Sequence, residues 1–341
     1  MGKIMFVRHG SGRGPKIRMK RFRPAYFQPF IEEIRRSSPN LFARFVFWET
    51  GQHVPDLSDI DCVVFWLQDP LRERFPACFD DAFALEEEAK RRAIKMFNPP
   101  SSLSHSIKSV QAKMWLDAGL LTPPVTRIES YEKLMDLAQT FSYPLILRAD
   151  QLHAQKAMKW VDQEKDLKGL NPVDLVFPIA ASPFMDTRMG YETPPYSTHY
   201  HKKRALVMAD QVRNNHVFFA LDPIVGSKNS TFGHGRSFNP VLRMMGNRGI
   251  EAFLKADFAF FEAWTSHREV LLRASEALQQ NLVSIDYSTR ADGQVVLWEA
   301  NPHFALHMWP LNLLAAKRQI GKRTQSLHQT IRDGLIHVSP S

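Results

Sequence analysis

The sequence has few cysteines and no long apolar run. Its two cysteines, Cys62 and Cys78, are too few for a disulfide framework or a cysteine-based metal centre. No stretch approaches the ~18 consecutive apolar residues of a membrane span. The first residues also lack the apolar core of a signal peptide. We therefore expect no contact with a membrane, and the cytoplasm is the compartment that the composition favours.

Acidic residues are fewer than basic ones. The 341 residues include 44 Lys and Arg against 35 Asp and Glu, which gives a formal net charge of +9. Such an excess favours anionic partners, either phosphorylated small molecules or nucleic acid. Part of it lies in the block KIRMKRFR at 16–23, where the interleaved Phe22 would suit contact with nucleic acid. A solvated basic loop, or a loop near phosphates, is the simpler interpretation, so we expect no nucleic-acid partner.

The order of apolar runs predicts an α/β protein of several domains. A chain of 341 residues is long enough for two or three domains of roughly 100–200 residues each. Residues 1–98 alternate short apolar runs with helical patterns, which predicts an N-terminal βαβ domain. Within it, residues 84–97 have the spacing of one amphipathic helix. The sequence PPSS at 99–102 indicates the end of this domain.

Helix signals recur in the rest of the chain. Ser130 precedes an apolar pattern of helical spacing, as a residue at a helix start does. Gly119 follows another such pattern and is expected to end that helix. Residues 312–338 predict one C-terminal helix or two.

The most informative stretch is a predicted hairpin at 282–301, in which LVSIDYS and QVVLWEAN flank a turn. Asp286 and Glu299 lie on opposite strands. Asn301 follows Glu299 by two residues, so both project from one face of their strand. Two carboxylates and an amide oxygen suit Mg²⁺, which prefers hard oxygen ligands. The alternative is an ordinary hairpin with an acid near one end and a capping Glu, and both interpretations stay open.

The order of motifs along residues 98–305 resembles the ATP-grasp superfamily. The motifs are a helix that carries a lysine, then AGLLTPP, YPLILR, KKRALVMADQV and IDYS…DG…WEANP. D-alanine–D-alanine ligase, glutathione synthetase and the RimK-type glutamate ligases belong to this superfamily. The resemblance implies an α/β fold in which an N-terminal βαβ (pre-ATP-grasp) domain, residues 1–98, precedes a two-lobed α+β ATP-grasp body. The central lobe would cover 99–180, and the C-terminal lobe with its final helices would cover 181–341.

The resemblance also implies roles for single residues. Asp286, Glu299 and Asn301 would hold the Mg²⁺ ions that bridge the ATP phosphates. Arg204 would be catalytic and would face the transferred phosphoryl group, where a planar guanidinium can bind two oxygens. The other residues implied to bind ATP are Lys108, Arg148, His153, Ala181, Ser182, Phe184, Asp186 and Lys202.

The contacts implied for this ATP-binding set differ in kind. Lys108 would meet a phosphate, the backbone of 181–184 would bind adenine, and Asp186 would reach the ribose. From the residues alone, Lys108 could equally be a solvent-facing lysine on a helix. Arg204 could equally be an exposed arginine on a strand.

The chain departs from the superfamily in the segment that covers the phosphates. Arg148 stands where the second nucleotide-binding lysine is expected, at the end of YPLIL. The glycine-rich flap that normally follows is absent, because ADQLHAQKAM at 149–158 contains no glycine. In its place, His153 and Lys156 would contact the phosphates with their side chains.

The activity implied is an ATP- and Mg²⁺-dependent ligation. ATP would phosphorylate a carboxylate to an acyl phosphate, and an amine (or a thiol) would then displace the phosphate. The substrates would be small molecules or peptides, and a homodimer is expected because many members dimerise. The alternative is a degenerate ATP-grasp fold that binds a nucleotide or a nucleic acid without catalysis. The net charge and the missing flap favour this alternative, whereas the intact acidic set favours the ligase.

The loop after the first strand raises another hypothesis. The sequence RHG at 8–10 follows the apolar run IMFV, as it does in histidine phosphatases. The second His-Gly that this activity requires is His234-Gly235, which follows a loop rather than a strand. In the ATP-grasp interpretation the first loop faces the cleft instead, and His9, Ser11 and Arg13 would contact the substrate.

A zinc site is the last alternative. His199 and His201 are two residues apart, and His216 could approach from the next strand. No cysteine joins them. We therefore favour solvated histidines, or a position of His216 near the phosphates.

Overall fold

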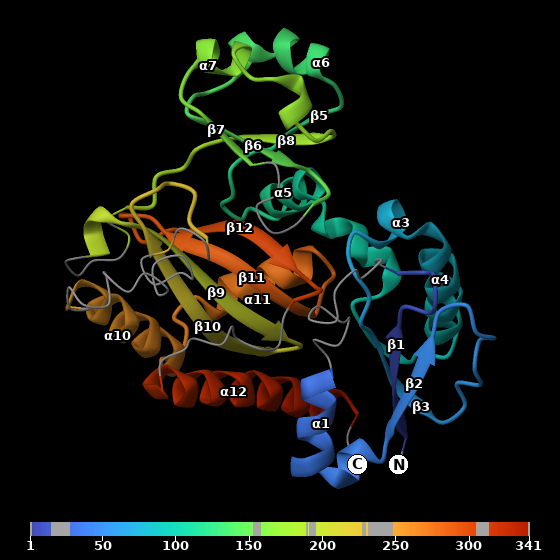
Figure 1. Ribbon diagram of the computed structural model, residues 1–341. Coiled ribbons are helices and arrows are strands. Elements are labelled where there is room, and N and C mark those ends of the chain that lie inside the picture. Colours follow the sequence, from blue (N-terminus) through green and yellow to red (C-terminus); the bar gives the residue numbers. More distant parts are fainter. Residues whose placement is uncertain are drawn as a thin grey trace.

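The chain folds around three four-stranded β-sheets, as the computed structural model shows (Figure 1). One sheet is parallel and the other two are antiparallel. This arrangement confirms the α/β class expected from the sequence. The structure describes residues 2–14, 28–152, 158–188, 190, 196–226, 230, 248–304 and 314–339.

The parallel sheet, in the order β2-β1-β3-β4, forms the N-terminal domain. Its four inner residues in β1 are all buried, because helices cover both faces of the sheet. Helix α4 covers the face of Met5 and Val63, and α1 covers the face of Phe6. The elements of this domain are β1 (Lys3–Arg8), α1 (Gln28–Ser37), α2 (Pro39–Phe42), β2 (Phe45–Glu49), β3 (Ile60–Phe65), α3 (Leu71–Arg74), α4 (Pro76–Arg91) and β4 (Lys95–Phe97).

The amphipathic pattern at 84–97 is divided between two elements. Helix α4 ends at Arg91, and Ala93 then has a φ of +54°, in the left-handed region that ends a helix. The following residues form β4, which pairs with β3 and buries Phe97. The prediction of a single helix over 84–97 was therefore wrong at its C-terminal end.

The second sheet, in the order β5-β8-β6-β7, forms the central lobe. Helices α6 and α7 lie above it in Figure 1 and pack on it through an apolar cluster that includes Leu134, Leu147 and Leu167. We placed the end of this lobe at residue 180, whereas β8 continues the sheet to Pro183. The elements are η2 (Pro100–Ser106), α5 (Lys108–Asp117), β5 (Thr126–Ile128), α6 (Tyr131–Asp136), η3 (Ala138–Thr140), β6 (Leu145–Ala149), β7 (Lys159–Val161), α7 (Glu164–Lys168), η4 (Pro172–Asp174) and β8 (Ile179–Pro183).

Both helix-end signals in this lobe are confirmed. The Ser130 hydroxyl accepts a hydrogen bond from the Lys133 N–H at 3.3 Å, which caps the start of α6. Gly119 follows α5 with a φ of +69°, a conformation that glycine adopts without strain.

The third and largest sheet, in the order β10-β9-β11-β12, forms the C-terminal lobe. One face packs on α5 and α11 around Trp115 and Ile285, and the other packs on α12 around Leu206 and Leu327. The predicted hairpin at 282–301 is confirmed as β11 and β12, and the C-terminal pattern forms one helix that reaches α1 (Figure 1). The elements are η5 (Tyr196–Thr198), β9 (Tyr200–Met208), β10 (Gln211–Ala220), α10 (Arg248–Glu262), α11 (Arg268–Ala277), β11 (Leu282–Thr289), β12 (Val295–Asn301) and α12 (Leu314–Val338).

Hydrogen bonds join the N-terminal domain to the C-terminal lobe. The Asn98 amide donates to the Leu282 carbonyl at 2.6 Å and accepts from the Leu282 N–H at 3.1 Å. The buried Arg44 donates to the Ser339 carbonyl at 2.8 Å, at the end of α12. These contacts fix the N-terminal sheet beside the third sheet.

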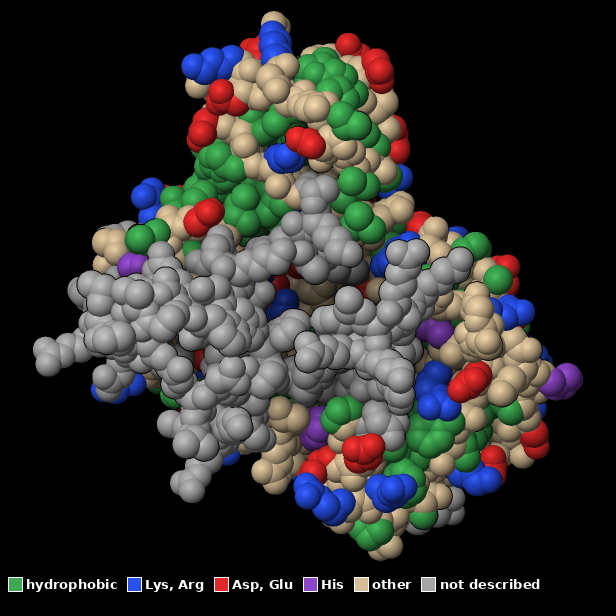
Figure 2. Space-filling view, viewed as in Figure 1, with side chains coloured by type: hydrophobic (Ala, Val, Ile, Leu, Met, Phe, Trp, Pro, Cys, Tyr) green, Lys and Arg blue, Asp and Glu red, His purple; other side chains and the backbone are tan. Residues whose placement is uncertain are grey.

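The surface of the described residues is mixed in charge. In the space-filling view, Lys and Arg lie among Asp and Glu over the N-terminal domain, and hydrophobic side chains gather where the central lobe meets the body of the molecule (Figure 2). The helices within the described ranges are all too short or too polar to cross a membrane.

Candidate active site

The two acids of the hairpin are direct neighbours across the strands. Asp286 on β11 pairs with Glu299 on β12, and directly paired residues of an antiparallel sheet share one face. The register shifts next to this pair, so that Trp298 forms a β-bulge beside Glu299. Asn301 pairs with Ser284 on the same face. The structure therefore brings the three predicted metal ligands together.

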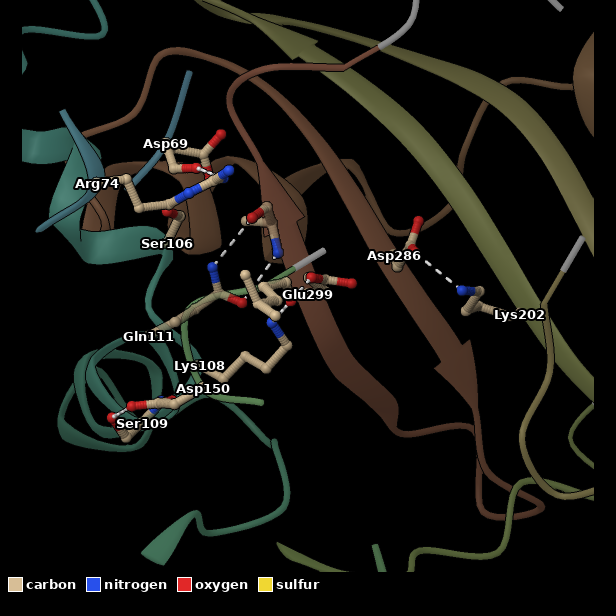
Figure 3. A network of polar contacts seen from close by, with 12 residues as sticks. Asp69, Arg74, Ser106, Lys108, Ser109, Gln111, Asp150, Lys202, Asp286 and Glu299 are labelled. Carbon is tan, nitrogen blue, oxygen red and sulfur yellow. Dashed lines mark hydrogen bonds and ion pairs between the residues drawn. The ribbon is translucent and has the colours of Figure 1, made fainter. Parts of the chain in front are cut away.

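Two cations on β9 meet Asp286. Arg204 Nη2 donates to Asp286 Oδ2 at 2.8 Å. Lys202 Nζ lies 3.1 Å from the same oxygen, as Figure 3 shows. The Asp286 side chain is only 1% exposed. Burial would raise the pKa of Asp286, but the charges of Arg204 and Lys202 hold it at about 2. Asp286 is therefore a carboxylate at every physiological pH.

Glu299 faces a third cation from the central lobe. Lys108, the first residue of α5, lies with its Nζ 3.6 Å from Glu299 Oε1 and donates to the Leu152 carbonyl at 2.6 Å (Figure 3). Burial lowers the pKa of Lys108, and the charge of Glu299 opposes that shift. Lys108 is buried, so the solvent-facing alternative is excluded.

Asp150 fixes the start of α5 against the end of β6. Its carboxylate accepts hydrogen bonds from the Ser109 N–H at 2.9 Å and from the Ser109 hydroxyl at 2.7 Å (Figure 3). A carboxylate at a helix N-terminus accepts hydrogen bonds from backbone N–H groups and interacts favourably with the helix dipole. Arg148 lies on β6, two residues before Asp150. The contact between Asp150 and Ser109, the residue after Lys108, therefore holds Arg148 and Lys108 near each other.

Gln111 fixes β12 in a similar way. Its side-chain amide accepts from the Ala300 N–H at 2.9 Å and donates to the Ala300 carbonyl at 3.2 Å. These two bonds reproduce the hydrogen bonds that the backbone of a neighbouring β-strand would make with Ala300. Because Ala300 lies between Glu299 and Asn301, Gln111 sets the position of both.

Arg148 supplies a buried donor. Its Nε is inaccessible to solvent and finds no hydrogen-bond partner in the described part of the chain. Burial lowers the pKa of Arg148, while the charges of Glu299 and Asp150 oppose the shift. A buried N–H without an acceptor is costly, so this donor is suited to an anionic ligand.

Five of these charged side chains line one cavity with about 860 Å³ of unoccupied space, part of it open to solvent, whereas the predicted residues Arg204 and Asn301 are not among its lining. Its charged lining comes from α5, β6, β9, β11 and β12. Its apolar lining comes from the central lobe and from the residues after β10, and consists of Ile146, Leu152, Met158, Phe184, Met185, Pro223, Ile224 and Val225. The predicted residues that line the cavity are Lys108, Arg148, Ser182, Phe184, Lys202, Asp286 and Glu299.

The structure does not bring two other predicted ATP-binding residues to this cavity. Ala181 lies on β8 between β5 and β6, where the strand ladders use its backbone groups, and its side chain packs in the apolar cluster under α6. Asp186 is paired with Arg188 at the surface, and hydrogen bonds from Arg188 lower its pKa. His153 and Lys156 lie outside the described residues.

The first loop is held inside the N-terminal domain. His9 Nε2 accepts from the Gln68 N–H at 2.8 Å, and its Nδ1 lies 3.1 Å from the Arg13 carbonyl. Arg13 forms an ion pair with Asp81 and donates to the Ala77 carbonyl at 2.9 Å. Burial lowers the pKa of His9, which keeps its ring neutral. Neither side chain lines the cavity, and the substrate role of His9 and Arg13 stays a prediction.

Ser11, the third residue of that prediction, is exposed and likewise absent from the cavity lining. His234, on which the phosphatase hypothesis depended, lies outside the described residues. His201 accepts from the Thr289 N–H at 3.0 Å, and burial lowers its pKa to about 3. No three His, Cys, Asp or Glu side chains gather around a metal position within the described ranges, which leaves the zinc hypothesis without support there.

Sequence reasoning missed several residues of the site. Met185 and Trp298 line the cavity, and Gln111 and Asp150 hold its walls. Asp150 directly follows β6, and an acidic residue at the end of an apolar strand already indicates a polar contact there. Gln111 contacts a residue 189 positions away, and nothing local in the sequence announces such a contact.

No protein-family profile and no curated protein matches the sequence. Solved structures match along nearly its whole length. The ATP-grasp ligase PsnB, complexed with a phosphomimetic variant of its minimal precursor, Mg and ADP, has a TM-score of 0.54 at 12% identity, covering 98% of this chain and 99% of its own. D-alanine–D-alanine ligase from Bacillus anthracis, complexed with ATP, has a TM-score of 0.52 at 11% identity, covering 99% and 98%.

A third match is the RimK domain ATP-grasp protein from Sphaerobacter thermophilus. Its TM-score is 0.51 at 11% identity, with 98% of this chain and 99% of that chain covered. These matches show that the overall fold of the chain is already known from other proteins. The chain has the ATP-grasp fold.

Proposed function

We propose that this protein is an ATP- and Mg²⁺-dependent ligase that joins a carboxylate to an amine. The cavity offers an apolar wall for a nucleobase and the cations Lys108, Arg148 and Lys202 for phosphates. PsnB bound to Mg and ADP, and D-alanine–D-alanine ligase bound to ATP, share its fold and support this assignment. The expected homodimer and the cytoplasmic location stay predictions.

Asp286, Glu299 and Asn301 would hold Mg²⁺. Their oxygens are of the kind Mg²⁺ prefers, and the cross-strand pairing places the two carboxylates on one face. Bound there, the ion would neutralise charge on the phosphates. The Nδ2 atom of Asn301 has no hydrogen-bond partner among the described residues, so this amide is not committed to another part of the fold.

The chain's own cations would carry the rest of the chemistry. Lys108 and Arg148 would bind phosphate oxygens from the central lobe. Lys202 and Arg204 would face the transferred phosphoryl group from β9. Transfer to a carboxylate gives an acyl phosphate, and the amine then displaces phosphate. Such a reaction depends on positioning and on charge neutralisation, and needs no activated serine or cysteine.

The observation that carries this proposal is the buried Arg148 Nε without a partner beside Lys108 and Glu299. Thermal unfolding with and without Mg·ATP tests it. At about 100 times its dissociation constant, the ligand should stabilise the wild type by about 2.7 kcal/mol. The variant E299A should lose most of the added stability, whereas E276A, which alters an exposed residue of α11, should keep it. A wild type that shows no shift with Mg·ATP would contradict the proposal.

The second candidate function is nucleotide binding without catalysis. The absence of glycine from 149–158 favours it, because a flap that lacks glycine offers the phosphates fewer accessible backbone donors. A thermal shift with Mg·ATP, without ADP formation in the presence of carboxylates and amines, would support this candidate. Tight, salt-sensitive RNA binding would instead indicate a nucleic-acid partner.

A further inference from the structure

One row of four side chains crosses the third sheet. His216 on β10 pairs with Arg204 on β9, Arg204 pairs with Asp286 on β11, and Asp286 pairs with Glu299 on β12. Residues paired directly across antiparallel strands share a face and lie about 5 Å apart at Cα. His216 therefore lies on the face of the proposed phosphate and metal site, one strand beyond Arg204.

A β-bulge places His216 in this row. Asn214 pairs with Ala205 and His216 pairs with Arg204, so that Asn215 is an extra residue on β10. Without the bulge, regular pairing would place Asn215 rather than His216 opposite Arg204. Bulges re-aim side chains and are frequent next to active sites. A second bulge, at Trp298, lies at the other end of the same row.

The ring nitrogens of His216 are not used by the fold. The side chain is 5% exposed, and its ring packs on Phe218 with the centroids 4.2 Å apart. Neither Nδ1 nor Nε2 has a hydrogen-bond partner in the part of the chain that the structure describes. Buried polar atoms without partners are rare because each one costs free energy, so such atoms point to a ligand.

Two more unpartnered groups belong to the same face. They are the Ser284 hydroxyl and the Asn301 Nδ2, which have no hydrogen-bond partner among the described residues. The two residues lie opposite each other in the register of β11 and β12. Ser284 and Asn301 lie one row along the strands from the Arg204–Asp286 pair, and His216 lies beside that pair on β10. The face therefore carries unpartnered polar atoms around the ion pair, while next to Ser284 it packs on α12 through Leu206.

We propose that His216 is the base that accepts the proton lost by the attacking amine. This proposal rests on the proposed ligase function. In that step the amine nitrogen bonds to the carbonyl carbon of the acyl phosphate, and the bond from that carbon to the phosphate oxygen breaks. Phosphate leaves with the electron pair. The proton moves from nitrogen to a ring nitrogen of His216, which later releases it to solvent.

The surroundings of His216 keep it in the form that this step requires. Burial lowers its pKa well below the ordinary value, and the positive charges of Arg204, Arg323 and Lys202 lower it further, while Asp286 opposes them. Arg323 comes from α12 and is itself paired with Asp257 of α10 at 2.8 Å. The ring is therefore neutral near pH 7, and its lowered pKa lets it take a proton only from a group more acidic than a free ammonium, as the amine nitrogen becomes once it bonds to the carbonyl carbon. Negative charge on the departing phosphate, next to Arg204, would stabilise the imidazolium.

The test compares two nucleophiles on the same acyl phosphate. The wild type and H216N are incubated with Mg·ATP and the proteinogenic amino acids as carboxylates, either with hydroxylamine or with the amino acids as amines. Hydroxylamine is largely unprotonated near neutral pH and needs little help from a base. The ratio of amide to hydroxamate should fall about 100-fold in H216N, the size of a typical contribution from general base catalysis. H328N, which alters a buried histidine on α12 that packs on Phe30 of the N-terminal domain, should keep the wild-type ratio.

Chemical rescue separates a base from a packing role. In H216A, imidazole should restore amide formation, whereas pyrazole, a ring of the same shape and a far weaker base, should not. An unchanged ratio in H216N, or equal rescue by both rings, would overturn the proposal. A wild type that forms neither hydroxamate nor amide would instead overturn the ligase function on which it rests. Mg·ATP thermal shifts of each variant report whether it is folded.

Discussion

At the scale of the residue, the balance between burial and neighbouring charges decides which side chains are ionised. Asp286 stays ionised because Arg204 and Lys202 outweigh the cost of its burial. Three histidines, of which His201 lines the cavity, stay neutral because no acid close to them outweighs desolvation. The pKa of His201 is lowered to about 3, and those of His267 and His328 to about 4. These neutral rings have a measurable consequence for stability.

The protein should lose stability as the pH falls below about 6.5. The unfolded chain binds protons on these histidines near 6.5, whereas the folded chain binds them only near pH 3–4. Each such residue then lowers the free energy of unfolding by up to ~1.4 kcal/mol per pH unit in that window. Urea unfolding at several pH values between about 7.5 and 5 measures the slope. H328N should make the slope shallower than that of H53N, an exposed control, and equal slopes would contradict this account.

At the scale of the element, helix ends and strand bulges position the site. Helix α5 carries Lys108 at its first residue and Gln111 one turn later, so its exact placement affects both lobes. Asp150 fixes its N-terminus, and Gly119 ends it with a left-handed turn. The bulges beside Glu299 and His216 act in the same way on the strands.

Gly119→Ala should destabilise the protein by about 1 kcal/mol, because alanine is strained at a φ of +69°. An added Cβ there would meet no atom within 4 Å, so backbone strain is the whole effect. Gly169 provides the matched control, since it ends α7 with a φ of −82°, which alanine adopts freely. Urea unfolding should show little loss in G169A. Equal losses in both variants would refute the argument from backbone conformation.

The elements near the site were the most predictable part of the chain. Alternation along 282–301 was enough to predict the hairpin and the shared face of Glu299 and Asn301. Capping chemistry identified Ser130 and Gly119. The strand β4 was missed because its three residues continue the helical spacing of α4. The contacts of Gln111 and the bulge at Asn215 were not predictable, because they depend on strands that are distant in sequence.

At the scale of the whole molecule, two of the three sheets line the proposed site. The central lobe contributes Lys108 and Arg148, and the third sheet contributes the acids. The N-terminal domain packs beside the third sheet, where Trp66 contacts Phe304 with ring centroids 5.7 Å apart, just beyond Asn301. The described residues of the N-terminal domain therefore support the third sheet without lining the cavity.

The transfer of a carboxylate oxygen to phosphate tests the central claim most directly. The protein would be incubated with Mg·ATP, an amine mixture and amino acids whose carboxylates carry ¹⁸O, and the released phosphate would be analysed by mass spectrometry. An acyl phosphate joins the carboxylate oxygen to phosphorus, so attack by the amine at carbon leaves that oxygen in the phosphate. The account predicts phosphate that carries ¹⁸O together with a new amide. Release of ADP with unlabelled phosphate only, or no release of ADP, would contradict it.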